Sequence, residues 1–403
     1  MSHFSKRIDL LKRPPFFAYM VGFLFAAIGN GLGYIAMSWI VITYHSNVTA
    51  MAILMACFWG PNVLLGPVMG VLADRLPRKW LIVTSNAIRA ILYIVFSLYL
   101  KNHFNVNTVY FLMLCTGIAF SIYYSSAFGF IRELVHEKEL MYANSTIDIM
   151  YEIGNVLGMG FAGLLIAWTS AETAILLNGI AFAIATMTVL FIPKKSLCHG
   201  GEKTKQVIRF IPDFRDGMQY LLARKKLMSI YLIQLLIFAT FTTAPLLLLP
   251  FCKIVLNTTA EQFGLIEASA SVGIVLGGIL MPWIAEKFNM IKTLLFFSYI
   301  LCLVFAVFGY NHIINIAILL YFIIGFSGAV WPLIITKAQS LTALSYQGRV
   351  QSTYNSLSGV LTLLFYFMIG WIGKYTGIAH LYWFEVLITA LAIMFLIQIK
   401  NDW

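Results

Sequence analysis

Long stretches of apolar residues recur along the chain, separated by short polar segments. Each stretch approaches or exceeds the roughly 20 residues that a helix needs to cross the hydrocarbon core of a bilayer. The stretches are residues 16–42, 49–72, 80–100, 108–130, 141–168, 172–192, 228–250, 262–285, 291–310, 313–336, 350–373 and 379–399. The pattern predicts an all-α membrane protein with twelve transmembrane helices.

The overall composition favours a membrane protein over a soluble one. Apolar residues make up 61% of the 403 residues and charged residues 11%, whereas soluble domains have about 45–50% and about 25%. The five cysteines are far apart and form no CxxC pair, so we expect neither a disulfide framework nor a metal site. No Walker A motif is present, which argues against ATP-driven pumping by this chain alone. We expect no cofactor.

The basic residues are distributed very unevenly between the two sides that twelve crossings define. Of the 27 Lys and Arg residues, 23 lie in the terminal and loop segments of one side, and only Lys101, Lys253 and Lys374 lie on the other. Basic residues are enriched in cytoplasmic loops. We therefore expect both termini in the cytoplasm, a location in the inner membrane, and a net charge of +11 that needs no nucleic-acid partner.

A polar segment near the middle divides the chain into two halves of similar size. Residues 193–227 form a predicted cytoplasmic linker between six-helix halves at 1–192 and 228–403. The second part of the linker alternates apolar and polar residues at helical spacing, which predicts an amphipathic helix along the inner membrane surface. Asp74-Arg75 and Glu286-Lys287 lie 212 positions apart, which supports a duplication of the halves.

A charged motif lies between the second and third apolar stretches. Its residues are Gly70, Asp74, Arg75, Pro77, Arg78 and Lys79. We expect Gly70 to let two helices approach closely, Asp74 to act on a neighbouring helix N-terminus, and the basic residues to pair with carboxylates or lipid phosphate. A plain charged loop is the alternative. The motif resembles the GxLaDrxGrk signature of the major facilitator superfamily, with Pro77 replacing the second glycine, and this resemblance implies a cytoplasmic gate.

The fifth apolar stretch carries glycines at helical spacing. Gly154, Gly158 and Gly163 resemble the gxxxGPxxGG motif of the antiporter branch of that superfamily, with Met159 and Ala162 at two of its positions. Small residues four positions apart permit close helix crossing, so generic packing is the alternative. The resemblance implies antiport.

The same stretch contains two acids, Asp148 and Glu152, one helical turn apart. At 1.5 Å per residue they lie about 10 and about 17 Å inside the inner boundary, where ionisable groups usually face a cavity or a partner. We expect one or both to bind protons; the alternative is a charge pair with Arg89 in the third stretch. Glu267 and Glu385 are expected nearer the outer edge, where they can reach water.

Substrate selectivity is expected from polar and aromatic residues in the stretches that line a cavity. The candidates are Asn30, Tyr34, Tyr123, Tyr124, Gln234, Phe238, Phe241, Trp331 and Asn355. Aromatic rings with scattered amides suit a bulky amphipathic ligand. Packing against lipid is the alternative for each of them.

Together with the segment PDFRDGMQYLLARKKL, these motifs resemble the bacterial macrolide-efflux and siderophore-exporter branch of the superfamily. The resemblance implies a proton-linked exporter of a small amphipathic molecule, and we expect it to act as a monomer. An importer or facilitator on the same fold remains an alternative. A non-transport membrane enzyme or sensor is the alternative from another class, although no Ser/His/Asp, metal or phosphate-binding constellation supports an enzyme.

Overall fold

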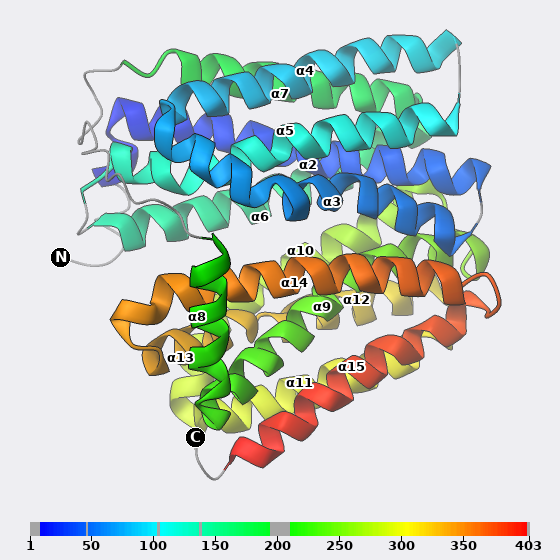
Figure 1. The fold of residues 1–403 in the computed structure, drawn as a ribbon. Helices are drawn as coiled ribbons and strands as arrows, with labels where there is room; N and C mark the ends of the chain where they lie inside the picture. Colours follow the sequence, from blue (N-terminus) through cyan, green and yellow to red (C-terminus); the bar gives the residue numbers. More distant parts are fainter. Residues whose placement is uncertain (1–8, 46, 103–104, 137–138, 194–209, 401–403) are drawn as a thin grey trace. The chain divides into compact units, whose positions relative to one another are not determined.

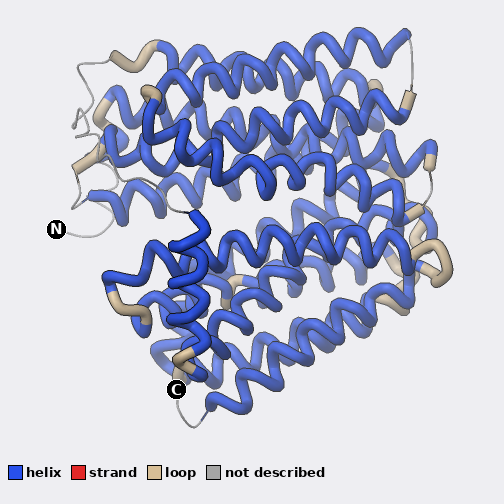
Figure 2. The backbone as a smooth tube through the Cα atoms, in the orientation of Figure 1, coloured by secondary structure: helices blue, strands red, loops and turns tan. Residues whose placement is uncertain are grey.

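A computed structural model describes residues 9–45, 47–102, 105–136, 139–193 and 210–400. These ranges contain helices, turns and bends, and no strand (Figure 2). Twelve helical segments among them are long and apolar enough to cross a membrane, because each contains an apolar run of the length that a bilayer core requires. The predicted all-α fold with twelve spans is therefore confirmed.

The chain divides into two compact units, which we describe separately. The first unit consists of Met1–Val41 and Cys57–Val207, and the second of Ile42–Ala56 and Ile208–Trp403. The helices before the linker are α2 (Pro14–Tyr44), α3 (Val48–Arg75), α4 (Arg78–Asn102), α5 (Val106–Leu134), α6 (Leu140–Trp168) and α7 (Ala171–Leu190) (Figure 1). Their bounds lie within a few residues of the predicted stretches.

The helices that follow belong to the second unit. They are α8 (Phe210–Leu222), α9 (Lys225–Ile254), α10 (Ala260–Phe288), α11 (Met290–Phe308), α12 (Ile314–Gly328), α13 (Trp331–Leu341), α14 (Leu344–Ile372) and α15 (Ile378–Ile399). A buried apolar cluster with residues from α8, α9, α10, α11, α13, α14 and α15 forms the core of this unit.

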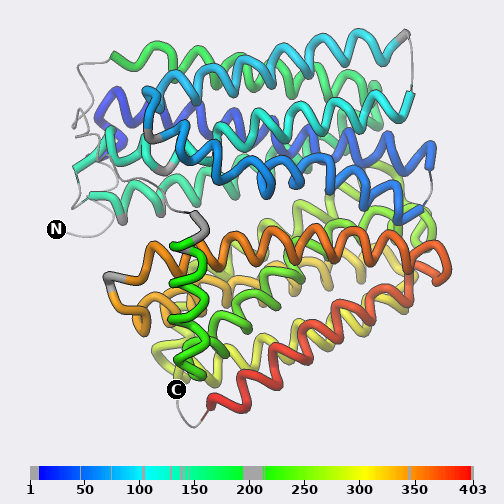
Figure 3. Tube along the Cα trace, in the orientation of Figure 1, coloured from blue at the N-terminus to red at the C-terminus, as the bar shows by residue number. Residues whose placement is uncertain are grey.

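In the first unit, α4 and α7 pack side by side along their length (Figure 3). Near their middles, Gly179 of α7 lies so close to α4 that a β-carbon would meet the backbone nitrogen of Ile94 at 3.0 Å. A glycine at this position lets the two helices approach closely. At one end, the hydroxyl of Ser97 donates to the carbonyl of Glu172 over 2.8 Å.

The predicted helix at 313–336 is interrupted in the structure. The helix α12 ends at Gly328 and α13 begins at Trp331, with Pro332 in its first turn. Proline has no N–H, so the regular i to i−4 bond to the carbonyl of Gly328 is impossible. The chain instead makes tighter bonds at this point, from Ala329 N to Phe326 O and from Val330 N to Ser327 O. The two helices still form one candidate span.

The predicted amphipathic helix of the linker is α8, and it packs against α14. The ring of Tyr220 stacks on Tyr346 with centroids 4.2 Å apart and planes inclined by 20°. Gly217 lies against the carbonyl of Arg349, which a β-carbon would approach to 2.8 Å, and Arg349 forms a 3.4 Å ion pair with Asp216. The side of α8 that carries Gly217 and Tyr220 is thus covered by another helix of the second unit, while Leu222 is 62% exposed.

An ion pair joins the beginnings of α2 and α6 and gives the protein a predicted pH dependence. Arg13 donates to both oxygens of Glu139, over 2.8 and 2.7 Å, and this lowers the pKa of the Glu139 carboxyl below its ordinary value. A carboxyl with a lowered folded-state pKa stabilises the fold above its unfolded pKa, near 4.3, and this contribution is lost as the pH falls through the folded value.

Replacing Arg13 by Gln is therefore expected to destabilise the protein slightly at neutral pH, by less than about 1 kcal/mol because the pair is partly exposed. The difference from the wild type should disappear in acid. Thermal unfolding in detergent across a pH series measures this difference in stability. The matched control is Lys12→Gln, because Lys12 pairs with Asp9 at 3.4 Å with both side chains largely exposed. Equal pH dependence in the two variants would contradict the prediction.

Candidate functional site

The glycines of α6 form a close crossing with α2. A β-carbon on Gly154 would meet the side chain of Ala27 at 2.5 Å, and one on Gly158 would collide with the carbonyl oxygen of Ile28. On the facing helix α2, a β-carbon added to Gly31 would lie 2.9 Å from the backbone nitrogen of Met159. Glycines at both surfaces allow the two backbones to touch. Gly163, further along α6, is also buried.

The two acids lie on α6 within two turns of this crossing. Asp148 is exposed and Glu152 is half-buried, and the two carboxyl groups interact electrostatically. Neither forms an ion pair with any residue in the described part of the chain. A charged group in a transmembrane helix is unfavourable in contact with lipid. This face of α6 therefore suits water or a polar ligand better than hydrocarbon.

Arg89 is buried in α4 and is stabilised without a carboxylate. Its exposed fraction is 1%, and its Nη2 donates to Oδ1 of Asn86 over 2.6 Å. The guanidinium lies 4.2 Å from the ring centre of Phe182 and 4.9 Å from that of Tyr123, which is a favourable position for a cation on aromatic faces. The alternative of a charge pair between Arg89 and the acids of α6 is not observed.

Tyrosines lie near both the buried cation and Glu152. Tyr123, which covers Arg89, is buried and lies near Tyr151 of α6. Tyr151 in turn lies near Glu152 and Tyr124. Polar side chains from α4, α5 and α6 are therefore neighbours inside the first unit. Sequence reasoning missed Asn86 and Phe182 as partners of Arg89, although the i, i+3 spacing of Asn86 and Arg89 was visible.

The gate motif residues have separate partners. Arg78 forms a 2.9 Å ion pair with Glu133 at the end of α5. The ammonium of Lys79 donates to the carbonyls of Leu190 and Ile192, each over 2.7 Å, and so caps the end of α7. Arg75 is exposed, and the side chain of Asp74 lies outside the described part of the structure.

The expected role of Gly70 in close helix approach is not observed. A β-carbon built on it would meet no atom within 4 Å. The motif predicted tight packing from residue type alone, whereas the space around a glycine depends on the neighbouring helix.

Candidates for substrate contact in the second unit partly come together. Phe238 and Phe241 of α9 both contact Trp331 at the start of α13, with ring centroids 5.5 and 6.4 Å apart. Gln234, one turn from Phe238, is buried and its Oε1 has no hydrogen-bond partner. Asn355 is exposed and accepts from Gln351 within α14. In the first unit, Asn30 and Tyr34 of α2 are half-buried, and Tyr124 of α5 is exposed.

Two other acids in predicted spans are more deeply buried than expected. Glu267 and Glu385 were expected to reach water near the outer edge, but their exposed fractions are 5% and 0%. Distance along a helix predicts depth in the membrane and does not predict which face the neighbouring helices cover. Both side chains are enclosed by the second unit.

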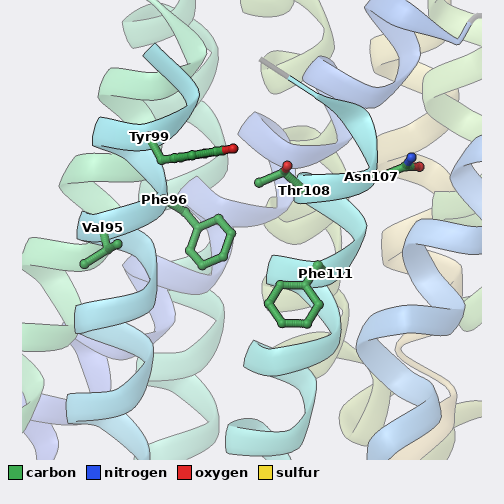
Figure 4. A pocket seen from close by; sticks show the side chains of 6 residues that line it. All are labelled: Val95, Phe96, Tyr99, Asn107, Thr108 and Phe111. Carbon is green, nitrogen blue, oxygen red and sulfur yellow. The ribbon is translucent and has the colours of Figure 1, made fainter. Parts of the chain in front are cut away.

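A recess of about 410 Å³ lies between α4 and α5 (Figure 4). It is lined by Val95, Phe96, Tyr99, Asn107, Thr108 and Phe111. It includes none of the predicted site residues. No group of three or more His, Cys, Asp or Glu side chains that could hold a metal occurs among the described residues.

Comparison with known proteins identifies the family. The family model of the Major Facilitator Superfamily matches residues 19–364. The chain belongs to the Major Facilitator Superfamily. The predicted superfamily is thereby confirmed, and the chain is a multi-pass membrane protein of this group of transporters.

Individual members of the superfamily are more distant. An uncharacterized MFS-type transporter of Bacillus subtilis, YfiS, is 25% identical over 177 residues, which cover 44% of this chain and 42% of YfiS. A staphyloferrin A transporter of Staphylococcus aureus is 22% identical over 269 residues, covering 66% of each chain. The matched stretches span about half the length of YfiS and of a second Bacillus subtilis relative, YkuC.

Solved structures share the superfamily fold along almost the whole chain. The nucleoside transporter NupG has a TM-score of 0.72 at 14% identity, covering 96% of this chain and 98% of NupG. A bacterial homologue of the iron transporter ferroportin, in an inward-facing state, has a TM-score of 0.71 at 15% identity, with coverages of 95% and 98%. At these identities the likeness shows the fold alone.

Proposed function

We propose that this chain is a secondary active transporter that exports a small amphipathic molecule across the inner membrane in exchange for protons. Both termini are in the cytoplasm in this proposal, as the distribution of basic residues indicates. The pair of acids on α6 is the observation that supports coupling of transport to protons. Asp148 and Glu152 have no cation partner in the described residues, and Arg89 is stabilised by Asn86 and aromatic rings instead.

These acids suit a role in proton exchange for a physical reason. A carboxyl group inside the membrane that lacks a compensating cation is more stable when protonated, and ionises when water or a ligand reaches it. All seven histidines lie outside the predicted spans or at their ends, so carboxyls are the natural proton carriers here. Protonation and ionisation of Glu152 would then accompany opposite states of the transporter.

One observation supports export over import, and a second bears on the substrate class. The α6 glycines that resemble an antiporter motif form a close backbone crossing with α2, as an interface between moving helices requires. One of the relatives is a staphyloferrin A transporter, and the sequence motifs suggest a substrate of the siderophore class. A substrate of this class or a macrolide would meet the aromatic group of Phe238, Phe241 and Trp331.

Everted membrane vesicles test direction and coupling together. Their cytoplasmic face is outside and respiration acidifies their lumen, so a proton-coupled exporter accumulates substrate inside. We expect uptake of erythromycin or staphyloferrin A in vesicles that contain the protein, and collapse of this uptake when nigericin abolishes the pH gradient. Accumulation only in right-side-out vesicles would identify an importer, and equilibration that ignores the gradient would identify a facilitator.

Replacing Trp331 by Ala tests the substrate class. The substitution removes a ring that the proposal places against the substrate, so we expect weaker binding of an amphipathic substrate by roughly 0.5–1.5 kcal/mol for each aromatic contact between Trp331 and the substrate. This should appear as a several-fold higher KM in vesicle uptake with little change in maximal rate.

The matched control for this prediction is Trp371→Ala, because Trp371 is a largely exposed tryptophan of α14 in the same unit. An unchanged KM in Trp331→Ala would show that the aromatic group of Phe238, Phe241 and Trp331 does not contribute to substrate binding.

A further inference from the structure

Glu385 occupies a fully enclosed position on α15 of the second unit. Its exposed fraction is 0%, and neither of its carboxyl oxygens has a hydrogen-bond partner. The helix α15 packs against α9 and α11, so the turn that carries Glu385 is covered by protein. The side chain does not extend to water.

The surroundings of Glu385 are apolar and contain no compensating cation in the described residues. Phe251 and Phe308 pack against the ring of Tyr382, with centroids 5.1 and 5.0 Å away. Tyr382 precedes Glu385 by one helical turn, and its own buried hydroxyl has no partner. No ion pair joins Glu385 to a Lys, Arg or His. An ionised carboxyl is therefore disfavoured here.

The other titratable groups nearby do not supply positive charge. They are Cys252 of α9 and Glu267 of α10, which interact electrostatically with the Tyr382 hydroxyl, and Cys302 of α11, whose sulfur contacts the carbonyl of Val386 at 3.8 Å. Lys253, adjacent to Cys252, forms no ion pair with Glu385. None of these groups forms an ion pair with Glu385.

The hydroxyl of Thr243 does not stabilise a negative charge on Glu385. Thr243 of α9 lies near the Glu385 carboxyl, but it donates its single hydroxyl proton to the carbonyl of Ala239 over 2.8 Å. A hydroxyl has only one proton to donate. The nearby hydroxyl therefore leaves the Glu385 carboxyl without a donor.

We propose that Glu385 is a proton-binding site in the second unit, separate from the acids of α6. The protonated carboxyl is enclosed where α15 packs against α9. Ionisation requires these helices to separate enough for water to enter. The site goes beyond the proposed function, because it lies on other helices and does not depend on the direction of transport or on which α6 acid exchanges protons.

Infrared spectroscopy of the full chain in lipid nanodiscs, without substrate, tests this site directly. A protonated carboxyl has a C=O stretching band that an ionised carboxylate lacks. We expect the wild type at neutral pH to show such a band, and Glu385→Gln to lose an intensity equivalent to one carboxyl. Glu261→Gln is the matched control, since Glu261 is an exposed acid of α10 in the same unit. It should leave the band unchanged.

An identical band in the wild type and in Glu385→Gln would overturn the proposal. Glutamine has the shape of a protonated glutamate, so this variant is expected to fold, as judged by gel filtration and circular dichroism. Misfolding of Glu385→Gln while Glu385→Asp folds normally would show that a negative charge is required, and would also overturn it. Because no transport is measured, these outcomes are independent of the vesicle experiment.

Discussion

The double variant Asp148→Asn, Glu152→Gln is expected to lose substrate accumulation driven by a pH gradient, down to the level of vesicles without the protein. Both amides keep the size and polarity of the acids but cannot exchange protons. Because neither acid has a cation partner among the described residues, no ion pair is broken and the fold should remain intact. Uptake in everted vesicles with an imposed pH gradient measures the loss.

Exchange of labelled for unlabelled substrate across the same membrane separates coupling from binding. Exchange needs no net proton movement, so the double variant should retain it. Glu261→Gln is a suitable control for both assays, because Glu261 is exposed at the start of α10. Gradient-driven accumulation at the wild-type level in the double variant would contradict the assignment of these acids to proton exchange.

The substitution Gly158→Ala is expected to destabilise the first unit by about 1–3 kcal/mol, the range found for overpacked interiors. The added methyl group would collide with the carbonyl oxygen of Ile28 and lie 3.1 Å from the α-carbon of Gly31. Both obstacles are backbone atoms of α2, so no side chain can rotate away and the helices must separate. Thermal unfolding of the purified protein in detergent measures the loss.

The control for this prediction is the same substitution at Gly70. A β-carbon there meets no atom within 4 Å, and replacing a glycine within a helix by alanine stabilises it by up to about 1 kcal/mol. Gly158→Ala should therefore lower the stability of the protein, and Gly70→Ala should raise it or leave it unchanged. Equal stability of Gly158→Ala and the wild type would show that the crossing of α2 and α6 adapts without strain.

The helical spans were predictable because the bilayer imposes a minimum apolar length that is visible in the sequence. The break between α12 and α13 was missed although its cause, Pro332, is visible as well. An apolar run through a proline continues to satisfy a hydropathy criterion, while the backbone hydrogen bond to Gly328 does not survive. Hydropathy therefore predicted the span and not its internal geometry.

The site was predictable only in part, because helical spacing identifies residues on one face and does not identify what covers that face. Asp148 and Glu152 were selected as candidates from their depth in the fifth span, and their role stays a prediction. Glu385 was assigned to the water boundary, and its actual enclosure depends on α9 and α11, which are more than 70 residues away in sequence. The aromatic partners of Arg89 likewise come from α5 and α7.

The contacts of Arg78 and Lys79 distinguish the basic residues of the segment between α3 and α4 from one another. Lys79 donates hydrogen bonds to the carbonyls at the end of α7, and Arg78 forms an ion pair with Glu133 of α5. Both cations therefore bind partners within the first unit. Arg75 is exposed at the end of α3 and forms no ion pair with another described residue. Replacing Arg75 would therefore break no ion pair among the described residues, whereas replacing Arg78 would break its ion pair with Glu133.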